Sequence, residues 1–247
     1  MSTHAGAVVL LHAAGLDRRM WNGIAASLLA RGHVVHTLDL PGHGGKRTIA
    51  VNDMEAIAAH VADEIIGLPR PLNLVGLSLG GMVAQLVAGT MQAHIGKLVL
   101  CDTMCGPREE LSNALRARAE RTRSVGAVGM IEETVARWFG PATLDTGAPI
   151  VGIVRGWLAE ADTEANARSW EAIAGFDARP ALAKLRDVPS LVVCGALDTA
   201  TPPAFSNEIA DLLPGSRMVL LEGLGHMAPL EDENGFVKLV AEFLEAE

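Results

Sequence analysis

Short runs of consecutive apolar residues recur along the chain and predict buried β-strands. The runs cover residues 7–12, 34–40, 72–77, 97–102, 190–195 and 218–223. Each run is apolar throughout instead of alternating between apolar and polar residues, which is typical of strands covered on both faces of a parallel sheet. The pattern therefore predicts a parallel sheet at the centre of the molecule.

Apolar residues at helical spacing lie between these runs and after the last one. One stripe comprises Met54, Ile57, Ala58, Val61 and Ile65, and another comprises Phe236, Leu239, Val240, Phe243 and Leu244. Asn52, followed three residues later by Glu55, is expected to cap the first of these helices. Strands and helices in alternation predict an α/β sheet with helices on both faces.

The alternation stops between residues 103 and 186, where only helical patterns remain. The expected stripes are Val128, Ile131, Val135 and Trp138, and then Ile150, Val154 and Trp157. One interpretation is extra helices packed by aromatic side chains. We favour a lid, because open α/β sheets bind ligands beyond the carboxyl ends of their strands. Residues 1–102 and 187–247 are thus expected to form the core, with a helical lid or cap, residues 103–186, inserted in it.

Composition narrows the class of protein. Of 247 residues, 49% are hydrophobic and 20% are charged, which is typical of a chain that buries a sizeable core. A formal net charge of −9 argues against a nucleic-acid partner, because phosphate binding needs clustered Lys and Arg. No apolar run approaches the roughly 20 residues that span a bilayer, and no cationic segment precedes the first run, so neither a membrane partner nor a signal peptide is expected. The three cysteines show no paired spacing, which favours the cytoplasm.

No metal or other cofactor is expected. Residues 42–45, Gly-His-Gly-Gly, are not followed by the Gly-Lys-Ser/Thr of a phosphate-binding loop, so we interpret them as a turn. Cys101 and Cys105 could form a metal or redox pair. Because no second pair matches them, we interpret both as small buried hydrophobic residues.

Residues 76–80, Gly-Leu-Ser-Leu-Gly, carry the candidate nucleophile. This G-x-S-x-G motif follows a predicted strand and precedes a predicted helix, the context in which such a motif exposes a serine hydroxyl on a sharp turn. The flanking glycines allow neighbouring backbone to approach closely. The alternative is a glycine-rich turn that only packs a helix on the sheet. We favour Ser78 as a nucleophile.

A nucleophilic serine needs a base that is oriented by an acid. Asp198 follows one predicted strand and His226 follows the next, so both are expected at the same edge of the sheet as Ser78. Their order along the chain, serine, acid and histidine, is that of α/β hydrolases. Asp102, at the end of an earlier strand, is the rival acid. Asp198 is favoured because glycine and proline flank its loop.

An oxyanion formed during acyl transfer needs N–H donors. The backbone of Leu79, directly after Ser78, is expected to supply one. The loop after the first strand is expected to supply the second, from the backbone of Ala14. The alternative for this loop is a plain turn between a strand and a helix.

The segments LLHAAGLDRRMW, LDLPGHGG, VGLSLGGMVA, GALDTATPP and GHMAPLE resemble those of bacterial α/β-hydrolase-fold esterases and lactonases. Within that superfamily the chain looks most similar to the 3-oxoadipate enol-lactonase-like group, through RWFGP in the lid and TPP after the acid. The resemblance implies an α/β-hydrolase fold with Ser78 as nucleophile, Asp198 as acid and His226 as base. It also implies the oxyanion donors Ala14 and Leu79. Trp138, Arg137 and Met227 are expected to contact the substrate.

Two features depart from these relatives. Their His-Gly after the first strand is His12-Ala13 here, which is expected to change how that loop is held. Many relatives also carry an antiparallel pair before the first strand, whereas only six residues precede it here. We therefore expect six parallel strands, as in the compact plant methylesterase and hydroxynitrile-lyase relatives.

The expected activity is hydrolysis of a small carboxylic ester or lactone through an acyl-enzyme, with an enol-lactone as the favoured example. Arg137 is expected to hold a substrate carboxylate. Two alternatives use the same residues. One is a C–C bond hydrolase, a lyase or a cofactor-free oxygenase, and the other is a non-catalytic ligand receptor.

Overall fold

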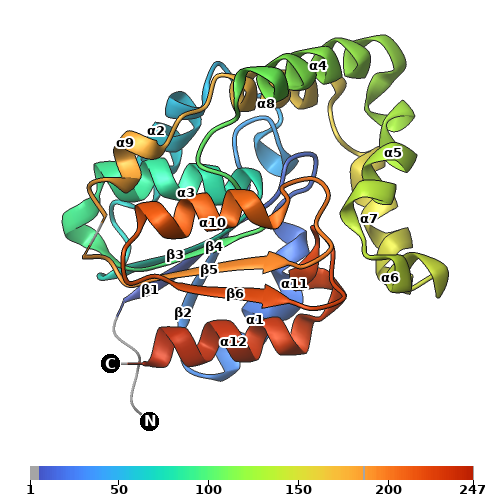
Figure 1. Cartoon of the computed structure of the whole chain (residues 1–247). Helices are drawn as coiled ribbons and strands as arrows, with labels where there is room; N and C mark the ends of the chain where they lie inside the picture. The colour runs from blue at the N-terminus through green and yellow to red at the C-terminus, as the bar shows by residue number, and fades with distance from the viewer. Residues whose placement is uncertain (1–5, 186, 247) are drawn as a thin grey trace.

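A six-stranded sheet forms the centre of the molecule (Figure 1). The structure is a computed structural model that describes residues 6–185 and 187–246. The strands are β1 (Ala7–Leu11), β2 (Val34–Leu38), β3 (Leu72–Leu77), β4 (Ile95–Cys101), β5 (Ser190–Gly195) and β6 (Arg217–Leu221). Every neighbouring pair is parallel, in the order β2-β1-β3-β4-β5-β6. The prediction of six parallel strands is confirmed.

The two edge strands differ from the predicted pattern of burial. All residues of β1 and β5 are buried, whereas those of β2 and β6 are partly or fully exposed. The reason is position, because β2 and β6 each have only one neighbouring strand. Continuous apolar runs therefore predict the strands correctly but do not distinguish edge from centre.

Helices cover both faces of the sheet, as predicted. One face carries α1 (Asn22–Ala30) and α12 (Glu233–Glu245), and the other carries α2 (Met54–Ile65), α3 (Leu79–Thr90) and α10 (Pro203–Leu212). Successive strand residues point to opposite faces, so Val8 packs with the first group and Val9 with the second. The predicted cap of α2 is wrong by one residue, because the carboxylate of Asp53, not Asn52, accepts the N–H of Ala56 at 2.7 Å.

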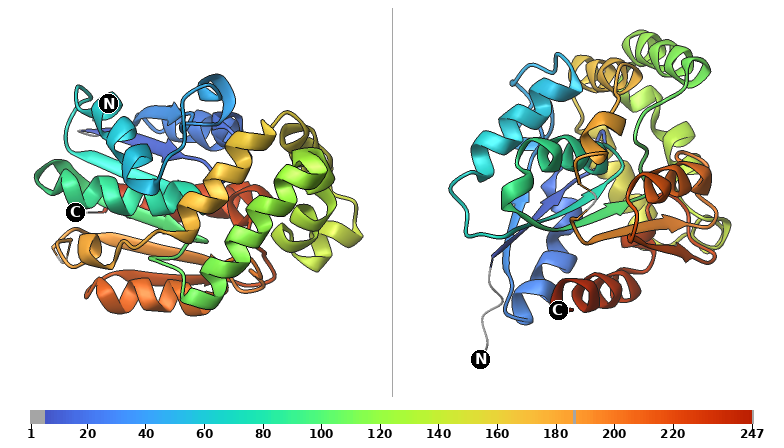
Figure 2. Two further views of the ribbon diagram at one scale, coloured as in Figure 1. Left: turned by 90° about the horizontal axis from the view of Figure 1, so that it is seen from above. Right: turned by 60° about the vertical axis from the view of Figure 1, so that its left-hand side comes forward.

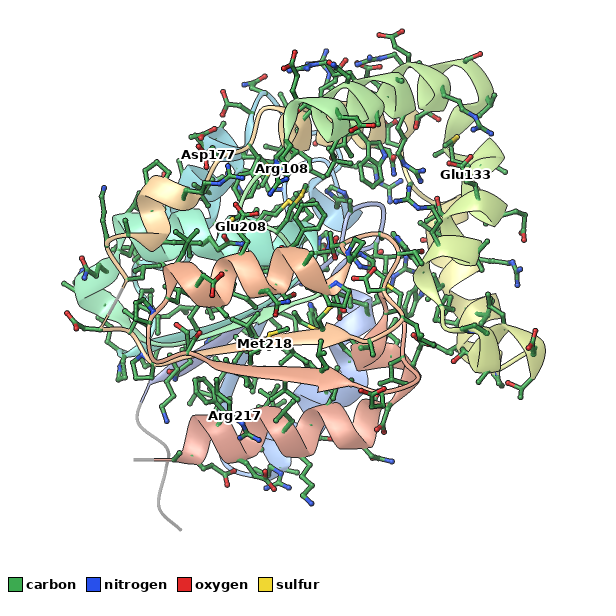
Figure 3. All side chains as sticks on the ribbon, viewed as in Figure 1. Arg108, Glu133, Asp177, Glu208, Arg217 and Met218 are labelled. Atoms are coloured by element: carbon green, nitrogen blue, oxygen red, sulfur yellow. The ribbon has the colours of Figure 1, made fainter. Side chains whose placement is uncertain are left out.

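The segment after β4 is helical and lies beyond the carboxyl ends of the strands (Figure 1). Its helices are α4 (Glu109–Gly129), α5 (Ile131–Trp138), α6 (Pro141–Asp145), α7 (Pro149–Ala159), α8 (Thr163–Ala174) and α9 (Arg179–Leu182). Figure 2 shows α4 and α8 side by side. At its end, the guanidinium of Arg179 donates to Asp177 at 3.0 Å and to Glu208 of α10 at 2.9 Å, which ties the returning chain to the core. Figure 3 labels the two acceptors, Asp177 and Glu208. Below, α4 to α9 are called the cap.

One predicted stripe of the cap is wrong in part. Ile131, Val135 and Trp138 are buried on α5, but Val128 is 62% exposed. Gly126 has a φ of 76°, which kinks α4 and turns the residues after it out of the expected periodicity.

Four shorter helices complete the described chain. They are η1 (Arg18–Trp21), η2 (Gly44–Lys46), η3 (Gln92–His94) and α11 (Ala228–Glu231). Among the described residues, none of the helices combines the length and the apolar character needed to cross a membrane.

Candidate active site

Ser78 lies on a strained turn between β3 and α3. Its backbone has φ 54° and ψ −115°, a region that residues with a side chain rarely adopt. Two close backbone approaches explain the flanking glycines. A Cβ on Gly76 would lie 2.3 Å from the carbonyl oxygen of Gly80, and one on Gly80 would lie 2.1 Å from that of Leu11. The motif thus presses the turn against β1.

Hydrogen bonds to the end of β4 and to the residues just after it hold this turn. The N–H of Ser78 donates to the carbonyl of Cys101 at 3.0 Å, and the hydroxyl of Thr103 donates to the carbonyl of Ser78 at 2.7 Å. Leu79 begins α3, so its N–H has no acceptor within the helix and lies directly after Ser78. The turn combines a half-exposed serine with backbone donors beside it.

Asp198 and His226 form a buried pair at the carboxyl ends of β5 and β6. Nδ1 of His226 donates to Oδ2 of Asp198 at 2.8 Å. The same carboxylate accepts the N–H groups of Ala200 and Thr201 at 2.7 and 2.9 Å, and the hydroxyl of Thr201 at 2.7 Å. These bonds fix the carboxylate and, through it, the imidazole ring.

Charge and burial act in opposite directions on this pair. Burial penalises the carboxylate of Asp198, but the charge of His226 and the hydrogen bonds from His226 and Thr201 outweigh it and lower the pKa of Asp198 to about 2. Burial likewise penalises a charged His226, but Asp198 outweighs it and raises the pKa of His226 above its ordinary 6.5. The geometry therefore stabilises a positive charge on the imidazole.

Asp102, the rival acid, lies close to the pair but is bonded elsewhere. Its Oδ1 accepts the N–H of Gly195 at 2.7 Å, and the thiol of Cys101 lies 2.8 Å from its Oδ2. Burial, and then the charge of Asp198, raise the pKa of Asp102 to about 8. Asp102 is therefore a neutral acid near pH 7, and it braces the end of β5.

Among the described residues, Asp102, Asp198 and His226 are the group whose spacing could suit a metal ion, since their ligand atoms lie within 4.8 Å of one another. The oxygens of Asp198 and Nδ1 of His226 are already bonded to each other and to the 199–201 turn. This donor set fits a hydrogen-bonded network better than a metal centre.

A cavity of about 420 Å³ lies between the core and the cap. Ser78, Thr201 and His226 line it from the core, and α4, α5 and α8 line it from the cap. Most of the cap side chains in its wall are apolar, with a few charged groups among them. Its size falls within the usual range for a small-molecule site.

The structure brings two of the three predicted substrate residues to this cavity. Trp138 and Arg137 of α5 both line it, and the Trp138 ring lies 6.0 Å from the ring of His226. Met227 does not line it. Its side chain is completely buried, and its N–H donates to the carbonyl of Trp138 at 3.0 Å. Ala14 lines a small adjoining void of about 10 Å³ that shares Trp138 with the main cavity.

His12 holds the loop that carries Ala14. Its Nε2 accepts the N–H of Leu40 at 2.9 Å, so Nδ1 bears the hydrogen and donates to the carbonyl of Ala13 at 2.8 Å. Burial, and then the charge of His43, lower the pKa of His12 to about 3, so the ring stays neutral. The loop is therefore held by His12, although alanine stands at position 13 where the relatives have glycine.

Glu231 is a positioning residue that the sequence did not single out. Its carboxylate accepts the N–H of Gly225, directly before His226, at 2.7 Å and the N–H of Gly140 in the cap at 2.8 Å. The histidine loop and the cap are thereby joined. A glutamate within two turns of the histidine, in GHMAPLE, is the local signal that could have indicated it.

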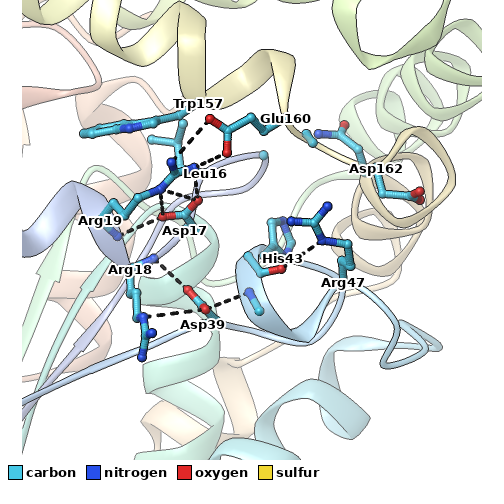
Figure 4. Close-up of a pocket in the computed structure, with 16 residues that line it drawn as sticks. Leu16, Asp17, Arg18, Arg19, Asp39, His43, Arg47, Trp157, Glu160 and Asp162 are labelled. Carbon is cyan, nitrogen blue, oxygen red and sulfur yellow. Dashed lines mark hydrogen bonds and ion pairs between the residues drawn. The ribbon is translucent and has the colours of Figure 1, made fainter.

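A second cavity, of about 240 Å³, lies between the loops after β1 and β2 and the end of α7 (Figure 4). Several of its charged groups are paired with one another, while Arg47 and Asp162 bond to backbone groups. Arg19 pairs with Asp17 and Glu160 at 2.7 Å each, and Asp39 accepts the N–H of Gly45 from the 42–45 turn. Because the carboxylate of Asp39 occupies this N–H group, its negative charge would repel a phosphate at the turn. Neither Ser78 nor His226 lines this cavity.

Comparisons with known proteins show what the chain as a whole is similar to. A sequence profile described as the alpha/beta hydrolase family matches residues 8–239. A pimeloyl-[acyl-carrier protein] methyl ester esterase from Neisseria meningitidis serogroup C is 31% identical over 244 residues, which cover 96% of this chain and 93% of that protein. 3-Oxoadipate enol-lactonase 2 from Acinetobacter baylyi is 25% identical over 93% of this chain and 85% of its own. The crystal structure of the enol-lactonase from Burkholderia xenovorans LB400 superimposes with a TM-score of 0.88 at 27% identity, covering 98% of this chain and 92% of that one.

Proposed function

The chain belongs to the alpha/beta hydrolase family, and from this premise we propose that it is a serine hydrolase that cleaves a carboxylic ester or lactone. The observation that carries the proposal is the joint position of Ser78 and the Asp198–His226 pair at one cavity. Esterases and a lactonase among the relatives support the same reaction class.

In the proposed mechanism, Nε2 of His226 takes the proton of Ser78 as the hydroxyl attacks the carbonyl carbon of the substrate. Asp198 keeps the imidazole in the tautomer that bears a hydrogen on Nδ1, and its charge stabilises the imidazolium that forms. The N–H groups of Leu79 and Ala14 bind the oxyanion. The protonated His226 then donates its proton to the oxygen of the leaving alcohol, and the acyl-enzyme remains. In the second step His226 takes a proton from water, which attacks the acyl group, and returns the proton to Ser78.

The cap is proposed to act as the lid that selects the substrate. It supplies Arg137 and Trp138 to the cavity, and Glu231 joins it to the histidine loop. An enol-lactone is the favoured substrate, supported by the enol-lactonases in the comparisons. A methyl ester is the competing substrate within the same class, after the Neisseria relative. The three free, buried cysteines fit the proposed location in the cytoplasm.

Turnover of p-nitrophenyl acetate tests the reaction class. A rapid release of p-nitrophenol equal to the enzyme concentration, followed by steady turnover, is the expected result for an acyl-enzyme. An unreactive protein that is nevertheless stabilised by ester ligands would instead indicate a receptor. A panel of enol-lactones and methyl esters, compared by kcat/KM, then separates the two proposed substrates.

A further inference from the structure

The cavity that contains Ser78 carries a surplus of positive charge. Arg118, Arg121 and Arg137 line it, and Glu133 is the carboxylate among its lining residues. Three guanidinium groups against one carboxylate leave a surplus of two positive charges, in a chain whose formal net charge is −9. Like charges gathered in a partly closed space repel one another unless an anion joins them.

Arg118 on α4 is the most deeply placed of the three. Its side chain is 10% exposed, compared with 59% for Arg121. Its guanidinium lies over the ring of Trp170 at 4.6 Å, and it donates to Glu133 at 3.0 Å and to Thr134 at 2.7 Å. A guanidinium has five N–H donors, so these two bonds leave most of its donor capacity unused.

Arg137 on α5 supplies the second charge. Within the described part of the chain its guanidinium has no ion pair, although it lines the same cavity. Its backbone is fixed, because its carbonyl accepts the hydroxyl of Thr199 at 3.1 Å. Burial, and then the charge of Arg137, lower the pKa of Arg118, which agrees with two guanidinium groups near each other. Arg121 already shares Glu133, at 2.7 Å.

We propose that Arg118 and Arg137 bind a carboxylate of the substrate at a distance from the bond that Ser78 cleaves. The substrate is then an anionic ester or lactone. Apolar residues such as Met82 and Leu115 line the same cavity and contact the hydrocarbon between the two polar ends. The planar fork of Arg118 suits a carboxylate, which can accept two parallel N–H bonds. This inference rests on the hydrolase function proposed above and deepens it.

Matched esters test the proposal by kinetics. Monomethyl adipate carries a carboxylate on the acyl part and dimethyl adipate is its neutral counterpart, while 4-acetoxybutanoate and its methyl ester place the charge on the alcohol part. Wild-type enzyme is expected to show higher kcat/KM for the anionic member of at least one pair. Arg118→Gln is expected to lower the anionic-to-neutral ratio of that pair by about 10- to 100-fold, and Arg137→Gln by about tenfold. The matched control is Arg116→Gln, an exposed arginine of α4 that lies outside the cavity and should leave the ratio unchanged.

A preference of the wild type for the neutral member of both pairs would overturn the proposal. So would a ratio that Arg118→Gln and Arg137→Gln leave unchanged, because a merely structural arginine affects both esters alike. If Arg118→Gln melts too low to assay, Arg137→Gln and the salt dependence of the wild-type ratio decide the question. An anion bound by arginine loses affinity as salt rises, whereas a neutral ester does not.

Binding separates this proposal from the hydrolase function. Adipate binding to Ser78→Ala is measured by calorimetry and by the change in tryptophan fluorescence, which is expected because Trp138 and Trp170 line the cavity. Adding Arg118→Gln is expected to weaken adipate binding by about tenfold or more, while adding Arg116→Gln is not. If the wild type hydrolyses neither p-nitrophenyl acetate nor any of these esters but this pattern holds, the hydrolase function fails and the anion site stands. Absence of adipate binding would overturn the anion site.

Discussion

The Nδ1 of His226 donates to Oδ2 of Asp198 at 2.8 Å, and both side chains are almost completely buried. The bond determines which nitrogen of the ring bears the hydrogen and leaves Nε2 as the proton acceptor. It also connects the ends of two strands, β5 and β6, at the cavity that Ser78 lines.

Ser78→Ala is expected to abolish ester turnover and leave the fold intact. Removal of the nucleophile from a comparable serine enzyme costs about 10⁶-fold in rate. Ser78 is partly exposed, and within the described residues its hydroxyl donates no hydrogen bond, so the melting temperature should be unchanged. Kinetics with p-nitrophenyl acetate and thermal melts measure both. Residual activity above about one hundredth of the wild type would contradict the proposed mechanism.

Asp198→Asn is expected to lower kcat/KM by about 10³- to 10⁴-fold, because the imidazole loses the acceptor that sets its tautomer. Asp102→Asn is expected to cost much less. The amide replaces a neutral carboxylic acid of nearly the same shape, and its oxygen can still accept the N–H of Gly195. Steady-state kinetics of the two variants rank them, and the opposite ranking would assign the acid to Asp102.

The rate is expected to rise with pH through the titration of His226. The base must be neutral, and its pKa in the folded protein is raised, so the neutral form appears only at higher pH than for an ordinary histidine. The midpoint of kcat/KM against pH is therefore expected above about 6.5. In Asp198→Asn the pH midpoint of the residual activity should be lower, because the negative charge that raises the pKa of His226 is lost. A wild-type midpoint at or below the ordinary histidine pKa would show that Asp198 does not outweigh the effect of burial on His226.

Gly80→Ala is expected to destabilise the protein by about 3 kcal/mol or more and to lower turnover, since the added Cβ would lie 2.1 Å from the carbonyl oxygen of Leu11. Gly152→Ala is the matched control. Gly152 lies in α7 with nothing within 4 Å of an added Cβ, so alanine there should stabilise the helix by about 0.5–1 kcal/mol. Denaturant unfolding measures both variants. Equal stabilities would show that the turn does not require a glycine at position 80.

The sequence by itself determined the features that depend on local pattern. Apolar runs located all six strands, with β3 and β5 correct at both ends. The G-x-S-x-G motif placed Ser78 between a strand and a helix, because a turn of this kind needs glycine at fixed offsets. Parallel strands end at the same edge, so the positions of Ser78, Asp198 and His226 just after predicted strands already implied that they share it.

The tertiary structure alone decided what depends on the path of the chain. Arg118 and Arg137 lie on different cap helices and reach one cavity only because α4 and α5 fold over the strand ends. Met227 follows the histidine directly but is buried by the backbone bond to Trp138. Hydrophobic periodicity and short motifs report the neighbours of a residue within its own element. The wall of a cavity is built from several elements, and their relative positions follow from packing that no local pattern encodes.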